Sequence, residues 1–386
     1  MPELCTSSPD VVVVGGGIIG LSTAWRARER GLSVTLLERD TAGQGTSHVA
    51  AGMLAPVSEA EFGVAGRRLL ELGLGSARMW PGFAADLERA SGEQVGLLQA
   101  GTLTVARDED EARELERRLG FLAELGLPAE RLRASAARER ELGLAPTVRL
   151  AIESPDDHSV DPRCVLRALR RACDAAGVRI REHAAVESVE LDDAGERVMG
   201  VRLGAGERVR ADRTVLAAGP WTGEIEGLPA AAQVRVRPVK GQILRLRDPA
   251  GPGLLTRVVR FAGGYLVPRA DGRYALGATV EEKGFELTPT AGGVYELLRA
   301  CSELVPGIDE LQIEELSVGL RPGTPDNVPA IGRGALQGLV WATGHYRNGV
   351  LLAPLTAELV VAALVDEPPA PPADACRPDR SRAVPA

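Results

Sequence analysis

The stretch VVVVGGGIIGL, followed by a second short apolar run, constrains the fold of this chain more than any other feature. Residues 10–14 (DVVVV) form a continuous apolar run, which is typical of a strand buried on both faces. A glycine-rich turn follows, then a helix-like stretch that ends at Gly31, then the apolar run SVTLLE at 33–38. This order predicts a β-α-β unit of about thirty residues.

The glycines of this unit have the spacing of a dinucleotide fingerprint. Gly15-x-Gly17-x-x-Gly20 lies between the expected strand and helix, and Glu38 closes the second strand. The first glycine permits a tight turn, the second lets the backbone approach a pyrophosphate, and the third allows close helix–strand packing. Glu38 is placed to accept hydrogen bonds from ribose hydroxyls. The motif alone does not choose between NAD and FAD, and a glycine turn with a structural role is the alternative.

The rest of the chain predicts two interleaved domains. Short apolar strands return only at RTVLAAGPW (213–221) and LVWAT (339–343), whereas alternating patterns fill 233–281 and predict an antiparallel sheet. A cofactor reached from such separated segments is long and spans a domain junction, which favours FAD. We therefore expect an α/β chain with a split Rossmann-type FAD-binding domain and an α+β substrate domain, bounded as follows: 1–80, 150–225 and 320–366 for the first, 81–149 and 226–319 for the second, and 367–386 as a proline-rich, disordered tail.

Composition narrows the class of protein. The chain has 386 residues and a formal net charge of −8, with Lys240 and Lys283 as its only lysines. This balance argues against nucleic acid as the main partner. The N-terminus lacks the basic and apolar regions of a signal peptide, and no apolar run is long enough to span a membrane. Five scattered cysteines without a C-x-x-C pair fit reduced thiols, so we expect a cytoplasmic protein without a metal site.

Seven blocks of the sequence resemble, in order, those of the D-amino-acid oxidase superfamily, and most closely its glycine oxidase branch, which serves thiamine biosynthesis. The blocks are VVVVGGGIIGL, TSHVAAGML, VLAAGPW, PVKGQIL, GYLVPR, GLRPGT and GHYRNGVLLAP. They extend from about residue 10 to about residue 366. The combination of GLRPGT with GH-x-RNG is the specific part, because the glycine fingerprint occurs far more widely.

The resemblance implies a noncovalent FAD. Some relatives in this superfamily bind their flavin covalently through a cysteine. None of the five cysteines here lies in a matching block. A helix that begins near Gly349 would direct its N–H groups and dipole at the pyrimidine edge of the flavin. Besides the three fingerprint glycines, the implied FAD-binding residues are Ile18, Ile19, Glu38, Arg39, Thr46, Ser47, Ala51, Gly52, Met53, Val186, His345, Tyr346, Arg347, Asn348, Gly349, Val350 and Leu351.

The same resemblance implies how a substrate is held. Arg321 in GLRPGT would bind the substrate carboxylate through two parallel hydrogen bonds, and Tyr265 in GGYLVPR would donate to the same group. Arg347 would lie near substrate or flavin. Alternatively, Arg321 is a surface arginine in a turn, and Tyr265 is a core tyrosine whose hydroxyl is bonded elsewhere; neither would then bind substrate. Hydride passes directly to flavin N5 in this family, so no general base is needed, and the sequence contains no convincing acid–base constellation.

The expected activity is oxidation of glycine to glyoxylate, ammonia and hydrogen peroxide, with an imine that thiazole synthase could take up. We expect a homo-oligomer. The segment FAGG before Tyr265 and Val280 depart from the family pattern and could admit larger substrates. A D-amino-acid or sarcosine oxidase, or a tailoring oxidase acting on a glycyl group, is therefore the alternative. Two further alternatives are a flavoprotein that acts on tRNA and a flavin-binding protein without catalytic activity.

Overall fold

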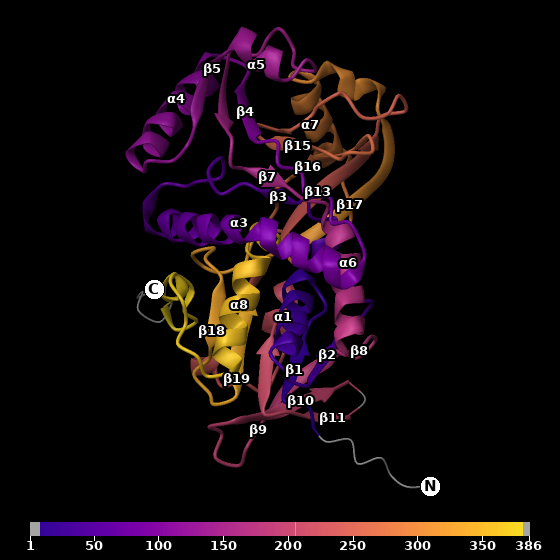
Figure 1. The fold of residues 1–386 in the computed structure, drawn as a ribbon, viewed down its shortest axis with the longest axis vertical. Coiled ribbons are helices and arrows are strands. Elements are labelled where there is room, and N and C mark those ends of the chain that lie inside the picture. Colours follow the sequence, from indigo (N-terminus) through magenta and orange to yellow (C-terminus); the bar gives the residue numbers. More distant parts are fainter. Residues whose placement is uncertain (1–7, 205, 381–386) are drawn as a thin grey trace.

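Strand β1 (Val11–Val14) is a central strand of a six-stranded sheet in this computed structural model, which describes residues 8–204 and 206–380. β1 pairs in parallel with β2 (Val34–Leu37) and β12 (Arg213–Leu216), which come from separate parts of the chain. The expected β-α-β unit is therefore confirmed, and Figure 1 shows its strands in the lower part of the molecule. The remaining strands of this sheet are β8 (Arg179–Arg181), β18 (Ala330–Arg333) and β19 (Leu339–Thr343).

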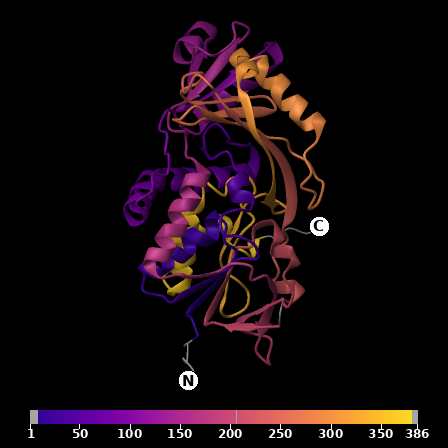
Figure 2. The ribbon, with the colours of Figure 1, turned by 90° about the vertical axis from the view of Figure 1, so that its right-hand side faces the viewer.

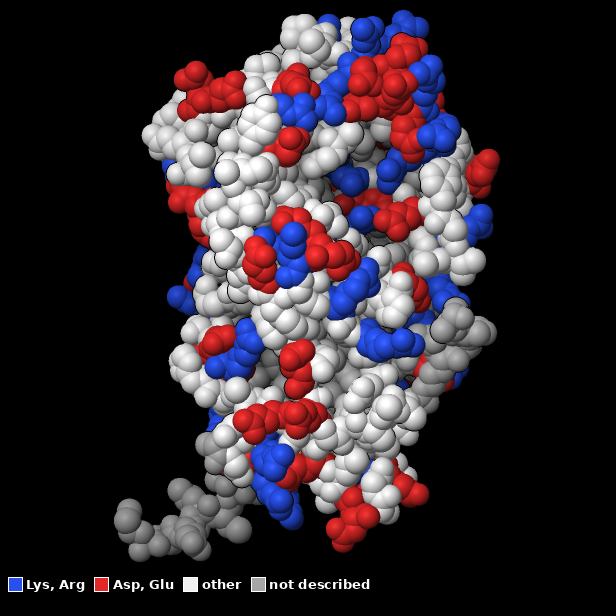
Figure 3. All heavy atoms as spheres, turned by 180° about the vertical axis from the view of Figure 1, so that it is seen from behind, with Lys and Arg blue, Asp and Glu red and all other residues white. Residues whose placement is uncertain are grey.

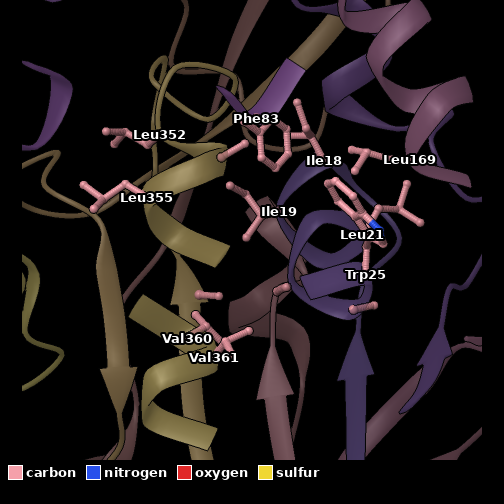
Figure 4. Close-up of a cluster of buried hydrophobic side chains, with 14 of the residues drawn as sticks. Ile18, Ile19, Leu21, Trp25, Phe83, Leu169, Leu352, Leu355, Val360 and Val361 are labelled. Atoms are coloured by element: carbon pink, nitrogen blue, oxygen red, sulfur yellow. The ribbon is translucent and has the colours of Figure 1, made fainter. Parts of the chain in front are cut away.

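Helices cover one face of this sheet. They are α1 (Ile18–Glu29), α6 (Pro162–Ala176), α8 (Ala353–Leu364) and part of α3 (Gly63–Ser91). Figure 4 shows Ile18, Leu21 and Trp25 of α1 packed among Phe83 of α3 and Leu169 of α6. The ring of Trp25 meets that of Phe83 edge-on, with centroids 5.6 Å apart. These apolar contacts hold the start of α1, and with it the glycine turn, against the carboxyl end of β1.

A three-stranded antiparallel sheet covers the opposite face. Its strands are β9 (Val186–Leu191), β10 (Val198–Leu203) and β11 (Arg208–Arg210). Val11 and Val13 of β1 belong to the core on the helical side, whereas Val12 and Val14 belong to the core under this small sheet. Burial on both faces explains why β1 is a continuous valine run and does not alternate with polar residues.

The second part of the molecule is built on an eight-stranded, mostly antiparallel sheet. Figure 2 shows the two large sheets arranged along the long axis, with segments from both ends of the sequence in the lower one. The upper sheet has the order β17 (Gln312–Gly323), β13 (Arg237–Arg247), β16 (Arg273–Gly277), β15 (Gly264–Pro268), β14 (Val258–Phe261), β4 (Thr102–Ala106), β6 (Leu150–Ser154) and β5 (Glu130–Arg133). Helices α4 (Glu109–Glu124), α5 (Ala134–Arg140) and α7 (Ala291–Ser302) pack on it.

Short elements join the two parts. Strands β3 (Met53–Leu54) and β7 (His158–Ser159) pair with each other, and helix α2 (Thr46–Val49) lies against α6 and β17. Four short 3-10 helices complete the described chain: η1 (Gly219–Glu224), η2 (Ala230–Ala232), η3 (Pro306–Glu310) and η4 (Ala373–Cys376). Within residues 8–204 and 206–380, no helix is both long and apolar enough to cross a membrane.

Sheet membership suggests domain boundaries that differ from the sequence-based ones. β6 and all of β17 belong to the eight-stranded sheet, although the sequence placed 150–154 and 320–323 with the FAD-binding part. Helix α3 continues to Ser91 and packs its buried side against α6 and α8. We propose accordingly that the first domain extends to about 91, resumes near 158, and resumes again near 324. These shifts depend on strand pairings between distant segments, which local patterns do not reveal.

The expectation of a disordered tail is wrong for residues 367–380. Cys376 is fully buried in the helical-side core, and Ala373 and Ala375 pack against the same core. Arg380 forms an ion pair with Asp326, 3.0 Å between Nη2 and Oδ1. Prolines discourage regular structure, but short apolar side chains between them can still fill a surface groove. Residues 381–386 of the predicted tail lie outside the described part of the chain.

Candidate active site

A cavity of about 1330 Å³ lies at the junction of the two sheets. It exceeds the roughly 300–1,000 Å³ of typical small-molecule pockets, so it has room for a dinucleotide together with a small substrate. One end is lined by the glycine turn and by Glu38, and the other by Arg321 and Tyr265 on the eight-stranded sheet. The cavity therefore connects the predicted nucleotide site with the predicted substrate site.

The glycine turn is fixed by close backbone packing. Gly15 has a φ of +106°, and a Cβ there would stand 2.5 Å from the carbonyl oxygen of Ala217, the residue that follows strand β12. A Cβ at Gly20 would overlap the carbonyl oxygen of Gly15. Gly17 is the N-cap of α1, and the N–H of Ile18 donates to Ser47 Oγ at 3.1 Å. The turn thus brings the N-terminus of α1 to the cavity wall, where N–H groups and the helix dipole favour an anion.

Glu38 and the residues after it form the far end of the cavity. The Glu38 carboxylate accepts hydrogen bonds from the N–H groups of Gly16 (2.6 Å) and Asp40 (3.0 Å), which orient it next to the glycine turn. The guanidinium of Arg39 lies over the ring of Trp221, with its Cζ 3.7 Å from the ring centroid. A carboxylate beside the turn and a stacked planar pair suit a ribose and an adenine respectively.

The two segments that carry GLRPGT and GHYRNG lie side by side. Gly323 forms a bridge with His345, and the N–H of Tyr346 donates to the carbonyl of Pro322 at 2.8 Å. Tyr346 adopts a φ of +48°, an unusual value for a non-glycine residue, so this turn is held by its surroundings. Sequence motifs about twenty residues apart therefore form one wall of the cavity.

Helix α8 begins later than the sequence suggested. It starts at Ala353, not near Gly349, and residues 349–352 form turns. The N–H of Leu352 donates to the carbonyl of Asn348 at 2.8 Å, so this segment turns toward the helix before regular hydrogen bonding begins. The prediction that this helix begins near Gly349 is therefore wrong, although Gly349 and Val350 do line the cavity.

His345 is a neutral, buried wall residue. Its side chain is almost fully buried, and Nε2 lies 2.9 Å from the hydroxyl oxygen of Thr356 in α8. Burial disfavours the charged imidazolium and lowers the pKa of His345 to about 3. The ring therefore carries no charge near neutral pH, and its hydrogen bond to Thr356 fixes its orientation.

Arg321 presents a cation to the cavity. Its Nη1 donates to the carbonyl oxygens of Lys240 (3.3 Å) and Thr279 (3.1 Å), and its guanidinium lies against Gly241. Among residues 8–204 and 206–380, no carboxylate forms an ion pair with Arg321. A positioned guanidinium without a protein counter-ion at a cavity wall is suited to bind an external carboxylate.

Tyr265 lies on the same face of the sheet. In the pairing of β15 with β16 it stands opposite Gly277, where a Cβ would be 2.8 Å from the Tyr265 hydroxyl. Burial raises the pKa of Tyr265 above its usual value, and the positive charge of Arg321 opposes this effect. The phenol therefore stays protonated near neutral pH and can donate a hydrogen bond into the cavity.

Arg347 lines the cavity but is already paired. Its Nη2 lies 2.6 Å from Oε1 of Glu61, and its Nε lies 3.4 Å from Oε2 of Glu59. The negative charge of Glu59 raises the pKa of Arg347. Arg347 therefore differs from Arg321, because two carboxylates already pair with its guanidinium.

Most of the predicted site residues line this one cavity, and three do not. Gly20 is buried in helix–strand packing, Asn348 belongs to the turn before α8, and the Leu351 carbonyl accepts from Ser76 Oγ and Trp80 Nε1. Those on the wall are Gly15, Gly17, Ile18, Ile19, Glu38, Arg39, Thr46, Ser47, Ala51, Gly52, Met53, Val186, Tyr265, Arg321, His345, Tyr346, Arg347, Gly349 and Val350.

Among the charged wall residues that the sequence analysis did not predict, two lie beside Tyr265. Arg260 stands opposite Tyr265 in the pairing of β14 with β15, and Glu59 lies between Arg260 and Arg347. Phe261 pairs with Gly264, so the hairpin loop has only two residues, the second of which is Gly263. A two-residue loop with glycine is a hairpin signal that fixes register, and it could have placed Arg260 beside Tyr265.

The residues present fit a noncovalently bound FAD. A Cβ at Gly15 would close the turn, the N-terminus of α1 faces the cavity, and Glu38 is positioned for a ribose diol. None of the four cysteines in the described residues lines the cavity. Over the same residues, no group of three or more His, Cys, Asp or Glu is arranged to hold a metal ion.

Comparison with known proteins agrees with this geometry. Residues 10–363 match the family described as FAD dependent oxidoreductase (DAO). The chain is 35% identical over 359 residues to the glycine oxidase of Geobacillus kaustophilus, covering 92% of this chain and 93% of that protein. It is 36% identical to the bifunctional protein ThiO/ThiG of Synechocystis, with 97% of this chain covered but only 54% of that protein.

The match in three dimensions is equally extensive. The crystal structure of glycine oxidase from Geobacillus kaustophilus superimposes with a TM-score of 0.86 at 33% sequence identity, covering 94% of this chain and 96% of that one. The chain spans about half the length of the bifunctional relatives that it matches. The sequence family, the fold and the cavity all agree, and this chain belongs to the family of FAD-dependent oxidoreductases.

Proposed function

We propose that this protein is a glycine oxidase, which converts glycine, water and oxygen to glyoxylate, ammonia and hydrogen peroxide. The observation that carries this proposal is the position of Arg321, a cavity-wall guanidinium without a carboxylate partner among the described residues, next to the protonated hydroxyl of Tyr265. Relatives that bear the name glycine oxidase cover nearly all of the chain and support the same assignment.

Arg321 and Tyr265 would hold the acid end of the substrate. The two carbonyl acceptors of Arg321 Nη1 fix one side of its guanidinium and leave the other edge directed toward the cavity. That edge can form two parallel hydrogen bonds to a carboxylate, and Tyr265 can add a third. If the carboxylate is bound at this wall, the α-carbon of the substrate lies inside the cavity at a fixed distance from the sheet.

Glycines on the sheet face make room for the groups proposed to hold the substrate. Gly241 and Gly319 stand opposite each other in β13 and β17, and Gly277 stands opposite Tyr265. A Cβ at residue 241 would meet the Arg321 guanidinium, and one at residue 277 would meet the Tyr265 hydroxyl, so these glycines leave room for the two side chains proposed to bind the carboxylate. FAD, when bound, supplies the group that accepts the hydride from the substrate α-carbon.

The chain's own residues need not remove the α proton. His345 is uncharged and engaged with Thr356, and Tyr265 is a protonated phenol. Positioning and electrostatics are therefore the contributions of the protein, in agreement with hydride transfer from a neutral amine. Met53 and Ile243 belong to an apolar cluster and give this part of the cavity an apolar wall.

A second candidate function rests on the open side of the cavity. Val280 is 65% exposed, and the neighbouring wall at 262–264 consists of alanine and glycine. On this side the cavity is wider than a site that accepts only glycine as substrate would need to be. A D-amino-acid or sarcosine oxidase, or an oxidase acting on a glycyl group of a natural product, is the alternative that this feature favours.

The relatives also suggest a partner. In the bifunctional ThiO/ThiG proteins, the matched half is joined to a second half that this chain does not span. We propose that the imine formed here passes to a thiazole synthase, in the cytoplasm, and that the enzyme is a homo-oligomer. Thiazole formation in a mixture of the two purified proteins, supplied with glycine and with the donors of the ring sulfur and of the remaining ring carbons, compared with either protein alone, tests the transfer.

A substrate panel tests the proposed activity. Purified protein of known flavin content is mixed with glycine, sarcosine, D-alanine and D-proline, and peroxide is measured. We expect the highest kcat/KM for glycine. Preference for a D-amino acid or sarcosine would select the alternative, and a yellow protein that makes no peroxide from any of them would contradict both.

A further inference from the structure

Three arginines hold the loop between α2 and β3 from behind. The carbonyl oxygens of four consecutive residues, 48–51, accept hydrogen bonds from them. Arg245 Nη2 lies 3.3, 2.7 and 2.9 Å from the carbonyl oxygens of residues 48, 49 and 50. Arg163 Nε donates to the carbonyl of residue 48 at 3.2 Å, and Arg269 Nη2 donates to that of residue 51. The carbonyl groups of this loop are therefore directed at the arginines and away from the cavity.

Two N–H groups of the same loop are left for a cofactor. Ala51 and Gly52 are buried and line the cavity. Their N–H groups have no hydrogen-bond acceptor within the described part of the chain. Buried N–H groups are rarely left unpaired, so at a cavity wall they favour an acceptor on the bound molecule. The family resemblance implies a contact with FAD at both residues, and the arginines hold the loop in the orientation that this contact requires.

Arg245 differs from the arginines at the surface. On the face of the molecule shown in Figure 3, Lys and Arg side chains mostly lie beside those of Asp and Glu. Arg245 is only 8% exposed, and no carboxylate of the described residues forms an ion pair with it. Glu315 stands opposite Arg245 in the β13–β17 pairing, but it pairs with Arg163 at 2.8 Å. Burial, and next the charge of Arg269, lowers the pKa of Arg245 to about 10, so its guanidinium stays charged near neutral pH.

The charge of Arg245 is not balanced by its neighbours. The other arginines of this cluster already pair with carboxylates: Arg163 with Glu315, Arg269 with Asp161, and Arg273 with both Asp161 and Asp271. Four guanidiniums, including that of Arg245, thus accompany three carboxylates. One positive charge remains in excess, and it lies in the interior of the protein.

This charge lies one layer of backbone away from the cavity. Ile243, two residues earlier in β13 and therefore on the same face of the sheet, lines the cavity. Residues 49–51, whose backbone covers the guanidinium, line it as well. The protein interior screens charge less than water does, so a buried cation acts on the cavity more strongly than an exposed one. FAD that accepts a hydride gains one negative charge, which a nearby cation stabilises.

We propose that Arg245 is a positioning residue for FAD, which holds the carbonyls of the 48–51 loop away from the cofactor and raises the reduction potential of the bound FAD. Arg163 and Arg269 assist in holding the loop, whereas the unbalanced charge of Arg245 acts on the potential. This inference goes beyond the proposed function, because it does not depend on which amine the enzyme oxidises.

FAD affinity and reduction potential test the two parts separately. Arg245→Gln removes the charge and cannot reach all three carbonyls. Serial dilution of the FAD-loaded protein, followed by the fluorescence of released FAD, gives the Kd. Equilibration with a reference dye and a chemical reductant gives the potential. We expect the Kd to rise at least tenfold and the potential to fall by about 30 mV or more, equal to a tenfold change in the equilibrium constant of a two-electron couple.

Three further variants separate charge from structure. Arg245→Lys keeps the charge but loses the planar fork, so the Kd should rise while the potential stays near that of the wild type. Glu315→Gln removes a negative charge beside Arg245 and should raise the potential. Arg247→Gln is the matched control: it removes the same charge from the same strand, but Arg247 is partly exposed and paired with Glu314. Neither quantity should change in that variant.

A wild-type Kd or a wild-type potential in Arg245→Gln would overturn the proposal, as would an equal fall in potential in Arg245→Lys. If Arg245→Gln does not fold, Glu315→Gln decides: a raised potential supports the proposal, and an unchanged or lowered one contradicts it. No amine enters these measurements. A protein that shows the expected shifts but is not reduced by glycine would therefore contradict the proposed function and leave the role of Arg245 standing.

Discussion

The guanidinium of Arg321 lies against the α-carbon of Gly241, so closely that a Cβ at residue 241 would stand 2.5 Å from both Nη1 and Nη2. Arg321 is opposite Val239 in the β13–β17 pairing, which makes Gly241 its diagonal neighbour on the adjacent strand. The absence of a side chain at 241 therefore determines where the guanidinium that we propose binds the substrate carboxylate lies, and this relationship is testable.

Gly241→Ala should displace the Arg321 side chain while leaving the strand in place, because the atoms that clash belong to the flexible end of an arginine. We expect KM for glycine to rise about tenfold or more, with smaller changes in kcat and in flavin content. Steady-state kinetics and flavin absorbance measure both. Gly120→Ala in α4, where a Cβ would meet nothing within 4 Å, is the control and should not change KM.

Arg321→Lys retains the charge but removes the planar fork. An ammonium cannot form two parallel hydrogen bonds to a carboxylate, and the lost charge-assisted bond is worth about 1.5–3 kcal/mol. KM for glycine should therefore rise roughly 10- to 100-fold, with the flavin still bound. Kinetics unchanged from the wild type would remove Arg321 from the substrate site.

Sequence patterns predicted the parallel core and the glycine turn because both depend on local order. Val11–Val14 and the spacing of Gly15, Gly17 and Gly20 specify a strand, a turn and a helix without reference to distant segments. The same patterns failed at Gly349, because α8 begins four residues later. A turn closed by a hydrogen bond to the Asn348 carbonyl contains the same residue types as the first turn of a helix, so the sequence did not distinguish the two.

The charged part of the site was harder to predict. Glu59 and Arg260 are about two hundred residues apart, and each is an ordinary charged residue in its own segment. They meet because β14 pairs with β15 and the loop after β3 folds onto that hairpin. Their ion pair is a product of tertiary structure, and only the register of the hairpin gave a local signal.

The ordered tail makes a contribution to stability that can be measured. Cys376 is buried and Arg380 is paired with Asp326, so deletion of 367–386 would expose core surface and leave Asp326 without this partner. We expect a loss of about 2 kcal/mol in the free energy of unfolding, the scale of burying one apolar side chain. Urea unfolding of the truncated protein checks this, and an unchanged midpoint would mean that the tail does not pack.

The ion pair between Glu315 and Arg163 should make stability depend on pH. The hydrogen bond from Arg163 lowers the pKa of Glu315 to about 2. A lowered carboxyl pKa adds stability that is complete above the ordinary pKa of 4.5 and is lost as pH falls toward 2. Glu315→Gln should thus be less stable than the wild type at pH 7 by up to about 1 kcal/mol, because the pair is partly exposed.

Unfolding measured between about pH 7 and pH 3.5 should show this difference narrowing below the ordinary pKa of Glu315. A difference that stays constant over that range would mean that the Glu315 carboxylate is not the source. Glu310→Gln, at an exposed position near the start of the same strand, is the matched control and should follow the wild type throughout.

Anaerobic mixing of the FAD-loaded protein with glycine is the most direct test of the central claim, that an amine held by Arg321 and Tyr265 gives up hydride in this cavity. Stopped-flow absorbance should show the oxidised flavin band bleaching in one phase that saturates with glycine, and Arg321→Lys should need far more glycine for the same rate. A flavin that keeps its oxidised spectrum in the presence of glycine, sarcosine and small D-amino acids would contradict the account.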